Sequence, residues 1–567
     1  IGVEHEKFIL NKDTLKPLNY DNIYGIKSIF GDLINLGWKP IFEGALNTII
    51  ALKRDSEYIT LEPGGQIELS GAQLDNIHQT CSETSNHLKE LKSLSNKNNF
   101  ILLGMGVEPN LSLDEFPWMP KERYSIMKKY MPKVGKLGHH MMLRSCTSQV
   151  NFDYSSEEDM IKKFRVLLNF ESVGTAMYAN SPFDQGKVSK YKSLRSHFWH
   201  HTDKDRTGLT PFVHGKNFNF ESYVDYALDV PMYFIKRDNN YIDMTNLTFN
   251  DFLNKQENND NKVYEATIED WSDHLSTLFP QVRLKQYLEV RSMDACSWNE
   301  ICSPAAFWTG ILYDEESLNA SLDLMKDWTD EERFLLNKEV PEHGLKTKFR
   351  NQTLLDIAKL LIEISENGLN KRNILSSNKE YNETYYLSNI KKNIEDGMSP
   401  ADYLLKKYNS SWKNSLDQIN NQCCEENFEQ INELMKIKKD FEKCINKKCY
   451  KYILPVYNPF KPPLKVLVLS KLDIIDDFLL DNEKTKYDNI IKSEQLENEQ
   501  DISKYKKKNK KLKKTVDQML KNYQKKILTL KEKNKILGDN FDLAYEMLSK
   551  PNRKKLDKIL EYIIKNI

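Results

Sequence analysis

Glutamates spaced two apart within short β-rich runs are the feature that most limits how this chain can fold. Glu4 and Glu6 lie in the run GVEHEKF. Glu62 and Glu68 flank a Pro-Gly-Gly turn in the run YITLEPGGQIELSG. Residues two apart on a strand point to the same face, and folds rarely bury unpaired carboxylates. The spacing therefore predicts a sheet with one polar, functional face. The plainer interpretation is that these glutamates face solvent on an edge strand or stand at the two ends of a hairpin.

Two further runs carry polar side chains with the same spacing. YLEVRSMD contains Glu289 and Arg291. The plainer interpretation of these two residues is an ion pair across strands, with no role in ligand binding. TSQVNFD contains Gln149, Asn151 and Asp153. Carboxylate and amide oxygens are the ligands that hard divalent cations prefer. We expect the glutamate-lined face to bind Mg²⁺ together with a phosphate chain.

A phosphate chain also needs cationic partners or a glycine-rich loop. The sequence contains no G-x-x-x-x-G-K-[ST] loop, and no Ser-His-Asp or Cys-His nucleophile pattern stands out. The candidate anion-binding residues are Arg144, Arg195, Arg206 and Arg291, each of which has an alternative as a salt-bridged or surface arginine. The residues alone thus predict a metal–nucleotide-binding protein and leave its substrate open.

The β-rich runs are scattered between long amphipathic stretches. The runs are 4–10, 58–69, 100–107, 148–152 and 286–291, and the amphipathic stretches include 74–93 and 157–170. Strands this dispersed and polar favour an α+β fold over a doubly wound parallel sheet.

The chain of 567 residues is longer than one core usually supports, so we expect more than one unit. Residues 1–412 have the composition of a globular domain, and 413–465 form a polar, then proline-rich linker. Residues 466–567 are lysine-rich, and from 505 to 541 core-type residues recur in steps of three and four with one break. This pattern predicts a helical, coiled-coil-like tail whose lysines face solvent. Self-association through the tail and packing of the tail onto the enzyme both agree with it.

Net charge and cysteine spacing limit the partners and the location. Lys+Arg and Asp+Glu both number 82, so nucleic acid is not an expected partner. The eight cysteines are sparse and irregular, which favours reduced thiols in the cytoplasm over a disulfide framework. No C-x-x-C pair marks a zinc site, and no apolar run reaches about 18 residues, so no transmembrane segment is expected. The chain begins at Ile1 within a strand pattern, so we expect a leading segment before it, and organellar targeting stays open.

Taken together, these segments resemble glutamate–cysteine ligases of the plant and proteobacterial type. The matching strings, in order within 1–412, include GVEHEKF, ITLEPGGQIELSGAQLDNIHQTC, ERYSIMKKYMPKVGKLG, MMLRSCTSQVNFDYSSEEDMIKKFR, SLRSHFW, TDKDRTG, FPQVRLKQYLEVRSMD and GLKTKFR. The resemblance implies a glutamine-synthetase-like fold, a curved and mostly antiparallel sheet with helices. It also implies the first step of glutathione biosynthesis. ATP phosphorylates the γ-carboxylate of L-glutamate, and the amine of L-cysteine attacks the γ-glutamyl phosphate.

The resemblance further implies roles for individual residues. The implied Mg²⁺ ligands are Glu4, Glu6, Glu62, Glu68, Glu289 and Gln149. The arginines implied to hold glutamate's carboxylates or the transferring phosphate are Arg144, Arg195, Arg206 and Arg291, with Arg291 and Glu289 as catalytic residues. The Gly-Gly turn would let the backbone approach the ligand closely.

Departures from the family pattern, and other functions, also have to be weighed. Met244 stands where the plant branch has a regulatory cysteine, so a plant-type redox switch is not expected, although Cys302 matches a family cysteine.

One alternative function is a ligase of the same fold with a different amine acceptor. The other is a non-catalytic coiled-coil interaction protein, against which the presence of all five glutamates argues.

Overall fold

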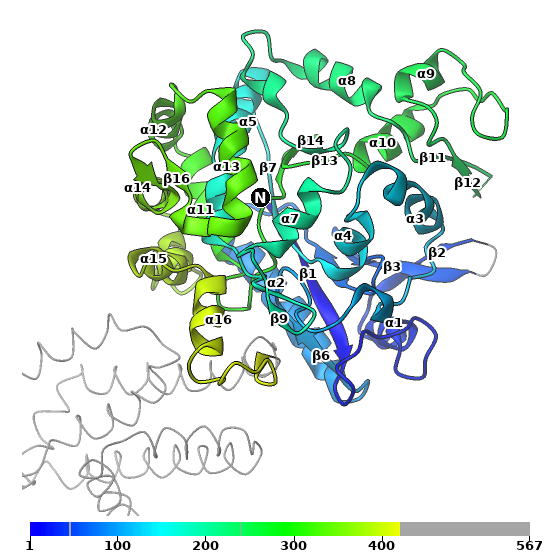
Figure 1. The fold of residues 1–567 in the computed structure, drawn as a ribbon, viewed down its shortest axis with the longest axis horizontal. Coiled ribbons are helices and arrows are strands. Elements are labelled where there is room, and N and C mark those ends of the chain that lie inside the picture. The colour runs from blue at the N-terminus through cyan, green and yellow to red at the C-terminus, as the bar shows by residue number, and fades with distance from the viewer. Residues whose placement is uncertain (45–46, 239, 420–567) are drawn as a thin grey trace, which may run out of the picture. The chain divides into compact units, whose positions relative to one another are not determined.

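An antiparallel sheet organises the part of the chain that the computed structural model describes, residues 1–44, 47–238 and 240–419 (Figure 1). In these residues the sheet has nine strands in the order β14-β15-β7-β1-β5-β4-β3-β2, and β6 also pairs with β1. The strands are β1 Gly2–Asn11, β2 Lys39–Glu43, β3 Thr48–Arg54, β4 Glu57–Leu61, β5 Ile67–Ser70, β6 Phe100–Leu103, β7 Ser148–Phe152, β14 Val282–Leu284 and β15 Leu288–Val290. Each pairing in this sheet is antiparallel. The predicted α+β fold with a mostly antiparallel sheet is confirmed.

Strand β1 is the centre of this sheet. Its first half lies between β5 and β7, and its second half pairs with β6. Each of the five predicted β-rich runs contains a strand of this sheet, and the run 58–69 folds as the hairpin β4–β5. The hairpin β2–β3 was not predicted, because its residues do not alternate cleanly between polar and apolar.

Helices cover both faces of the sheet. The helices are α1 Ile26–Asn35, α2 Ile77–Ser95, α3 Glu122–Val134, α4 Gly138–Arg144, α5 Glu157–Asn169, α6 Glu171–Met177, α7 Leu194–His200, α8 Phe220–Asp229, α9 Phe249–Leu253, α10 Ile268–Ser276, α11 Ser303–Leu312, α12 Glu315–Met325, α13 Asp330–His343, α14 Leu354–Arg372, α15 Ser388–Glu395 and α16 Pro400–Tyr408. Shorter elements are the 3₁₀ helices Leu113–Glu115, Pro211–His214, Gly344–Lys346 and Glu383–Leu387, and the strands β8 Phe183–Asp184, β9 Lys187–Val188, β10 Thr207–Gly208, β11 Phe234–Arg237, β12 Asn240–Asp243, β13 Phe279–Pro280, β16 Lys348–Phe349 and β17 Gln352–Thr353.

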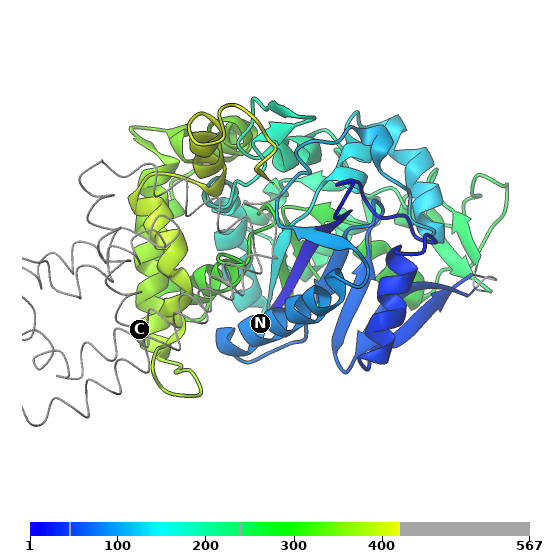
Figure 2. The same cartoon turned by 90° about the horizontal axis from the view of Figure 1, so that it is seen from below.

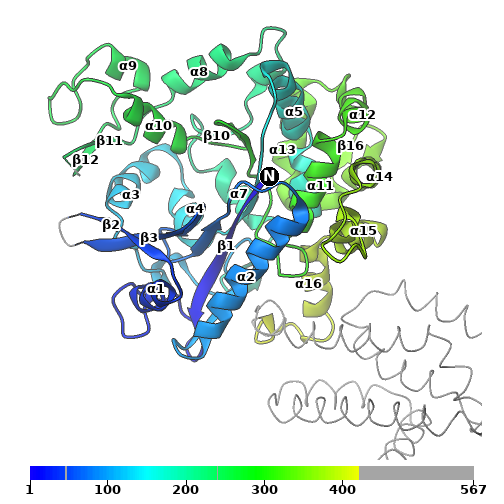
Figure 3. The same ribbon diagram turned by 180° about the vertical axis from the view of Figure 1, so that it is seen from behind.

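The two predicted helices both form, and each has a side-chain cap. Asn76 accepts a hydrogen bond from the backbone of Gln79 at the start of α2, and Ser156 accepts one from Asp159 at the start of α5. Helix α2 runs along one face of the sheet beside β1 (Figures 2 and 3). On that face the His5 ring of β1 lies 5.5 Å from the His87 ring of α2. The opposite face, which carries the glutamates, is turned toward α3, α4 and α7 (Figure 1).

Cysteine pairing differs from the prediction. Cys81 of α2 and Cys302, at the start of α11, form a disulfide with their Cα atoms 5.6 Å apart. The prediction of reduced thiols is therefore wrong for this pair, because the fold brings together two cysteines that stand 221 residues apart in sequence. Cys146 and Cys296 are buried and free.

The described part of the chain continues slightly past the predicted domain end at residue 412. Trp412, Leu416 and Ile419 are buried and belong to the main hydrophobic core. From residue 420 onward, the predicted linker, the four C-terminal cysteines and the predicted coiled-coil tail lie outside the described residues. No helix in the described part is both long and apolar enough to span a membrane.

Candidate active site

Strand register brings the predicted polar side chains onto one face of the sheet. Glu6 pairs with Glu68 across β1 and β5, and Glu4 pairs with Gln149 across β1 and β7. Asn151 pairs with Glu289 across β7 and β15. Directly paired residues share a face, so the face predicted from the two-residue spacing exists. Since β1 is a central strand and Glu68 is buried, the edge-strand interpretation does not hold.

The Pro-Gly-Gly turn places Glu62 at the end of the β4–β5 hairpin. The backbone N–H of Glu62 donates to the carbonyl of Gln66, and Gly65 has a φ of +87°. A Cβ on Gly64 would lie 2.4 Å from the carbonyl oxygen of Leu143. The glycines are thus needed because the turn packs against the backbone of α4. The predicted approach of the turn to a ligand stays a prediction, and Pro63 and Gln66 of the turn do line the pocket described next.

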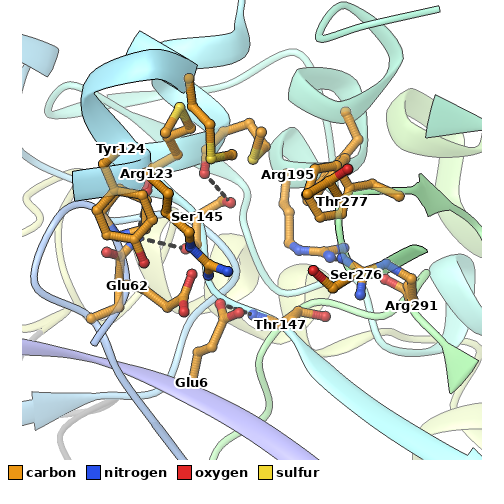
Figure 4. Close-up of a pocket in the computed structure, with 17 residues that line it drawn as sticks. Glu6, Glu62, Arg123, Tyr124, Ser145, Thr147, Arg195, Ser276, Thr277 and Arg291 are labelled. Carbon is orange, nitrogen blue, oxygen red and sulfur yellow. Dashed lines mark hydrogen bonds between the residues drawn. The ribbon is translucent and has the colours of Figure 1, made fainter. Parts of the chain in front are cut away.

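A pocket opens above this face (Figure 4). Its volume is about 710 Å³, open solvent at its mouth included. The residues that line it are Glu6, Glu62, Pro63, Gln66, Arg123, Tyr124, Met127, Met141, Met142, Ser145, Thr147, Arg195, Trp199, Ser276, Thr277, Phe279 and Arg291. Carboxylates from β1 and the β4–β5 turn therefore face guanidinium groups from α3, α7 and the segment after β15.

The clustered carboxylates repel one another. Burial, and after it the charge of Glu62, raises the pKa of the Glu6 carboxyl to about 8. Burial and the same neighbour raise the pKa of Glu68 well above its ordinary value. Burial also raises the pKa of Glu4, and Glu289 adds to this effect. Burial and neighbouring carboxylates thus push Glu4, Glu6 and Glu68 toward protonation, and a bound cation would relieve this.

Glu289 and Gln149 have other partners in the structure. Both oxygens of Glu289 accept from Arg283, and Arg291 also donates to it. Burial alone would raise the pKa of Glu289, but Arg283, Lys285 and Arg291 outweigh it and hold the pKa well below its ordinary value. Gln149 accepts from Arg291 and donates weakly to Glu4, 3.4 Å away. The geometry favours the ion-pair interpretation of Glu289, and its role as a metal ligand stays a prediction.

Two of the four predicted arginines line the pocket. Arg291 holds Glu289 and Gln149, as described above, and its guanidinium lies 5.6 Å from the centre of the Trp199 ring. Arg195 is buried and donates to the carbonyl of Arg291 at 3.0 Å, while its Nε has no hydrogen-bond partner. Both guanidinium groups lie on the side of the pocket opposite Glu62 (Figure 4).

The other two predicted arginines do not line the pocket. Arg144 is fully buried and bonds to Asp184 at 2.7 Å and to the carbonyl of Glu108. Arg206 is fully buried, bonds to Asp203 at 2.7 Å and lies over the Tyr233 ring at 3.8 Å. Most of their donors are used for internal contacts and neither residue lines the pocket, so their positions do not support the predicted substrate role.

Sequence reasoning missed Arg123, which lies next to Glu62 in the pocket (Figure 4). It is the second residue of α3, its Nε has no hydrogen-bond partner, and the next residue, Tyr124, donates to the carbonyl of Leu61 at 2.7 Å. Arg123 stands in the matching string ERYSIMKKYMPKVGKLG, which was the signal available for it.

Comparison with known proteins identifies the family of the chain. The model of "Glutamate-cysteine ligase family 2 (GCS2)" matches residues 1–426. Glutamate–cysteine ligase B, chloroplastic, of Oryza sativa subsp. japonica is 47% identical over 424 residues, which are 74% of this chain and 82% of that protein. The chloroplastic glutamate–cysteine ligase of Arabidopsis thaliana is 46% identical over 420 residues, 74% of this chain and 78% of that protein. Among solved structures, the glutamate–cysteine ligase of Francisella tularensis in complex with AMP aligns with a TM-score of 0.41 and 15% identity, covering 72% of this chain and 84% of that one.

Proposed function

Since this chain belongs to glutamate–cysteine ligase family 2, we propose that the pocket above the glutamate-lined face is its active site. The enzyme joins the γ-carboxylate of L-glutamate to the amine of L-cysteine at the expense of ATP, the first step of glutathione biosynthesis. The γ-carboxylate takes the terminal phosphoryl group of ATP and ADP leaves. The cysteine amine then attacks the γ-glutamyl phosphate, and phosphate leaves as the peptide-like bond forms.

One observation carries the assignment of the site: the Glu6 carboxyl, whose pKa burial and the charge of Glu62 raise to about 8, lines the same pocket as three guanidinium groups. Phosphoryl transfer to a carboxylate brings several negative charges together, so it needs cations fixed in advance. The pocket supplies such cations as guanidinium groups, and its carboxylates suit a metal ion that carries the phosphates.

We propose Glu4, Glu6, Glu62 and Glu68 as the side chains that hold Mg²⁺. In the described residues no three His, Cys, Asp or Glu side chains are already gathered as a metal site. The donors nevertheless fit, because all four are carboxylates, and burial and neighbouring carboxylates push Glu4, Glu6 and Glu68 toward protonation. When bound, Mg²⁺ neutralises charge on the phosphate chain and on the transferring phosphoryl group.

The arginines of the pocket suit the anionic parts of the substrates. We propose that Arg123 and Arg195 contact a carboxylate of L-glutamate or the transferring phosphoryl group, since each keeps a buried Nε without a partner. Arg291 holds Gln149 and Glu289 in place and presents its charge to the same pocket. Met127, Met141 and Met142 give the pocket an apolar wall that limits access of water.

Three predictions about the whole protein remain proposals. We propose a coiled-coil tail and self-association through it, on the heptad pattern between residues 505 and 541. For the location we keep the cytoplasm, with an organelle as the alternative, because the relatives named above are chloroplastic. Size-exclusion chromatography with light scattering, and imaging of the tagged full-length protein, test these proposals.

The assignment is tested by incubating the purified protein with ATP, Mg²⁺ and L-glutamate, with and without L-cysteine. ADP release and product mass are followed together. ADP release that depends on cysteine, with γ-glutamylcysteine as product, supports the proposed function. Equal ADP release with another amine would indicate a different acceptor, and no turnover with any amine would contradict the assignment of the pocket.

A further inference from the structure

Glu43 lies at the meeting point of three elements outside the pocket. It is the last residue of β2, and its carboxylate accepts two hydrogen bonds from elements distant in sequence. One comes from the backbone N–H of Glu122, the first residue of α3, at 2.7 Å. The other comes from the hydroxyl of Tyr241 in β12, at 2.8 Å. Helix α3 lies between the hairpins β2–β3 and β11–β12 (Figures 1 and 3).

The first of these bonds supplies a cap that α3 lacks locally. The residue before the helix, Lys121, makes no side-chain cap bond. A carboxylate at a helix N-terminus satisfies an unpaired N–H and interacts favourably with the helix dipole. The hairpin itself is fitted closely to this end of the helix, since a Cβ on Gly44 would lie 2.5 Å from a side-chain oxygen of Glu122.

The next two residues of α3, Arg123 and Tyr124, line the pocket. Tyr124 ties the first turn to β4 through its hydrogen bond to the carbonyl of Leu61, at 2.7 Å. Arg123 lies between Glu122 and Tyr124, and its guanidinium is directed into the pocket near Glu62 (Figure 4). Two anchors, one to β2 and one to β4, therefore hold the turn that aims Arg123. Burial and the hydrogen bond to Glu43 raise the pKa of the Tyr241 hydroxyl, and the charge of Arg123 partly offsets this rise.

We propose that Glu43 is a positioning residue that joins β2, β12 and α3 and thereby fixes where Arg123 meets its substrate. This inference rests on the proposed function for the role of Arg123 in substrate binding. The contacts of Glu43 belong to the structure itself. A shift of about 1 Å in a binding group is enough to lower a rate by about 100-fold, so loss of the junction has a measurable kinetic effect.

The test compares steady-state kinetics for each of the three substrates in variants of the full chain. Arg123→Lys identifies the substrate whose KM depends on Arg123. Glu43→Ala raises the KM of that same substrate about tenfold and lowers kcat less than threefold. Glu43→Gln keeps an oxygen for the Glu122 N–H and an amide for the Tyr241 hydroxyl, so its KM stays within about threefold of wild type. In the double variant Arg123→Lys/Glu43→Ala, the KM is no more than about twice that of Arg123→Lys, because both changes act through one contact.

Hydrogen exchange separates this proposal from the proposed function. The amides at the start of α3 exchange at least about tenfold faster in Glu43→Ala than in wild type, whatever reaction the protein catalyses. Glu57→Ala is the matched control, because Glu57 is a partly buried glutamate of β4 that bonds to Arg54 and not to α3. Unchanged exchange at α3, or a KM effect that adds fully to that of Arg123→Lys, overturns the proposal.

If Glu43→Ala does not fold, Tyr241→Phe replaces it, and an unchanged KM in that variant overturns the proposal equally. A wild-type protein without ligase activity would refute the proposed function and leave the exchange result to decide on Glu43.

Discussion

At the scale of single residues, burial and repulsion act together on Glu6, Glu62 and Glu68. A carboxylate is costly to bury, and several together are costlier unless a cation joins them. Strand pairing holds Glu6 and Glu68 in place, and a backbone hydrogen bond to Gln66 holds Glu62 in the turn, so the three side chains cannot readily move apart to relieve the repulsion. Their energetic cost in the free protein is what makes them suited to bind a metal–nucleotide.

Replacing Glu62 or Glu68 by Gln should lower kcat/KM for γ-glutamylcysteine formation by at least about 100-fold. The change keeps the shape of the side chain and removes the charge that a metal ion needs. Glu57→Gln, on the same hairpin but bonded to Arg54, should stay within about twofold of wild type. Steady-state assays at saturating Mg²⁺ measure both, and a loss smaller than tenfold in either pocket variant would contradict the proposed metal role.

The pKa of Glu6 also predicts how stability depends on pH. Because burial and Glu62 raise it to about 8 in the folded state, Glu6 contributes stability that is lost as pH rises from about 4.5 through about 8. Without Mg²⁺ the thermal midpoint should therefore fall by a few degrees between about pH 6 and about pH 8. Mg²⁺ should raise the midpoint more at the higher pH, where fewer protons compete with it.

Differential scanning calorimetry with matched variants isolates this effect. Glu6→Gln should reduce the dependence on both pH and Mg²⁺. Glu171 is buried and bonds to Asn337 at 2.9 Å, and burial raises its pKa to about 7. Glu171→Gln should therefore change the pH dependence and leave the Mg²⁺ effect intact. An equal Mg²⁺ effect in wild type and Glu6→Gln would count against Glu6 as a ligand.

The residue-level predictions succeeded where the signal was local. Two-residue spacing placed Glu4, Glu6 and Glu68 on a shared face because strand geometry determines side-chain direction. It could not separate Arg195 from Arg144, since both are buried arginines and their partners come from distant segments. Tertiary packing alone decides which of them meets the pocket.

At the scale of elements, the hairpin β14–β15 contains its own ion pair. Arg283 and Glu289 are directly opposite in register, and the guanidinium donates to both carboxylate oxygens. Arg283→Met should therefore lower the free energy of unfolding by about 3–5 kcal/mol, because it leaves a buried carboxylate without its main partner. Arg283→Met/Glu289→Leu should recover much of that loss. Urea unfolding of both variants measures this, and a single variant as stable as wild type would contradict it.

The disulfide connects the helix behind the sheet with the helix α11. The disulfide closes a long loop and so lowers the entropy of the unfolded chain. Reducing the disulfide should therefore lower the free energy of unfolding by about 2–5 kcal/mol. A reducing agent should lower the thermal midpoint of the wild type and leave that of Cys81→Ser/Cys302→Ser unchanged. The same shift in both proteins would show that the bond contributes nothing. Sequence spacing could not reveal this pair, because nothing near either cysteine marks the other as its partner.

At the scale of the whole molecule, the pocket and the main core both lie within residues 1–419. A chain that ends at residue 426 should therefore keep kcat/KM within about twofold of the full chain. A chain that ends at residue 411 removes Trp412, Leu416 and Ile419 from the core and should be less stable. Activity assays and thermal unfolding of both truncated chains test this, and inactivity of the longer one would give the tail a role in catalysis. The predicted domain end at residue 412 stays a prediction, although Leu416 and Ile419, which follow it, pack into the described core.

The central position of β1 has a consequence for synthesis on the ribosome. This strand is made first among those described, yet one of its partners, β7, begins at Ser148, and β15 follows only at Leu288. Ribosomes add about 5–20 residues per second, so β7 is synthesised roughly 10–30 s after β1. Strand β15 follows after about the same interval again. During this interval a nascent chain exposes a strand whose free edge can pair with others. Glu4 and Glu6 then have a second use, since charged side chains on an unpaired strand disfavour aggregation before they ever meet a substrate.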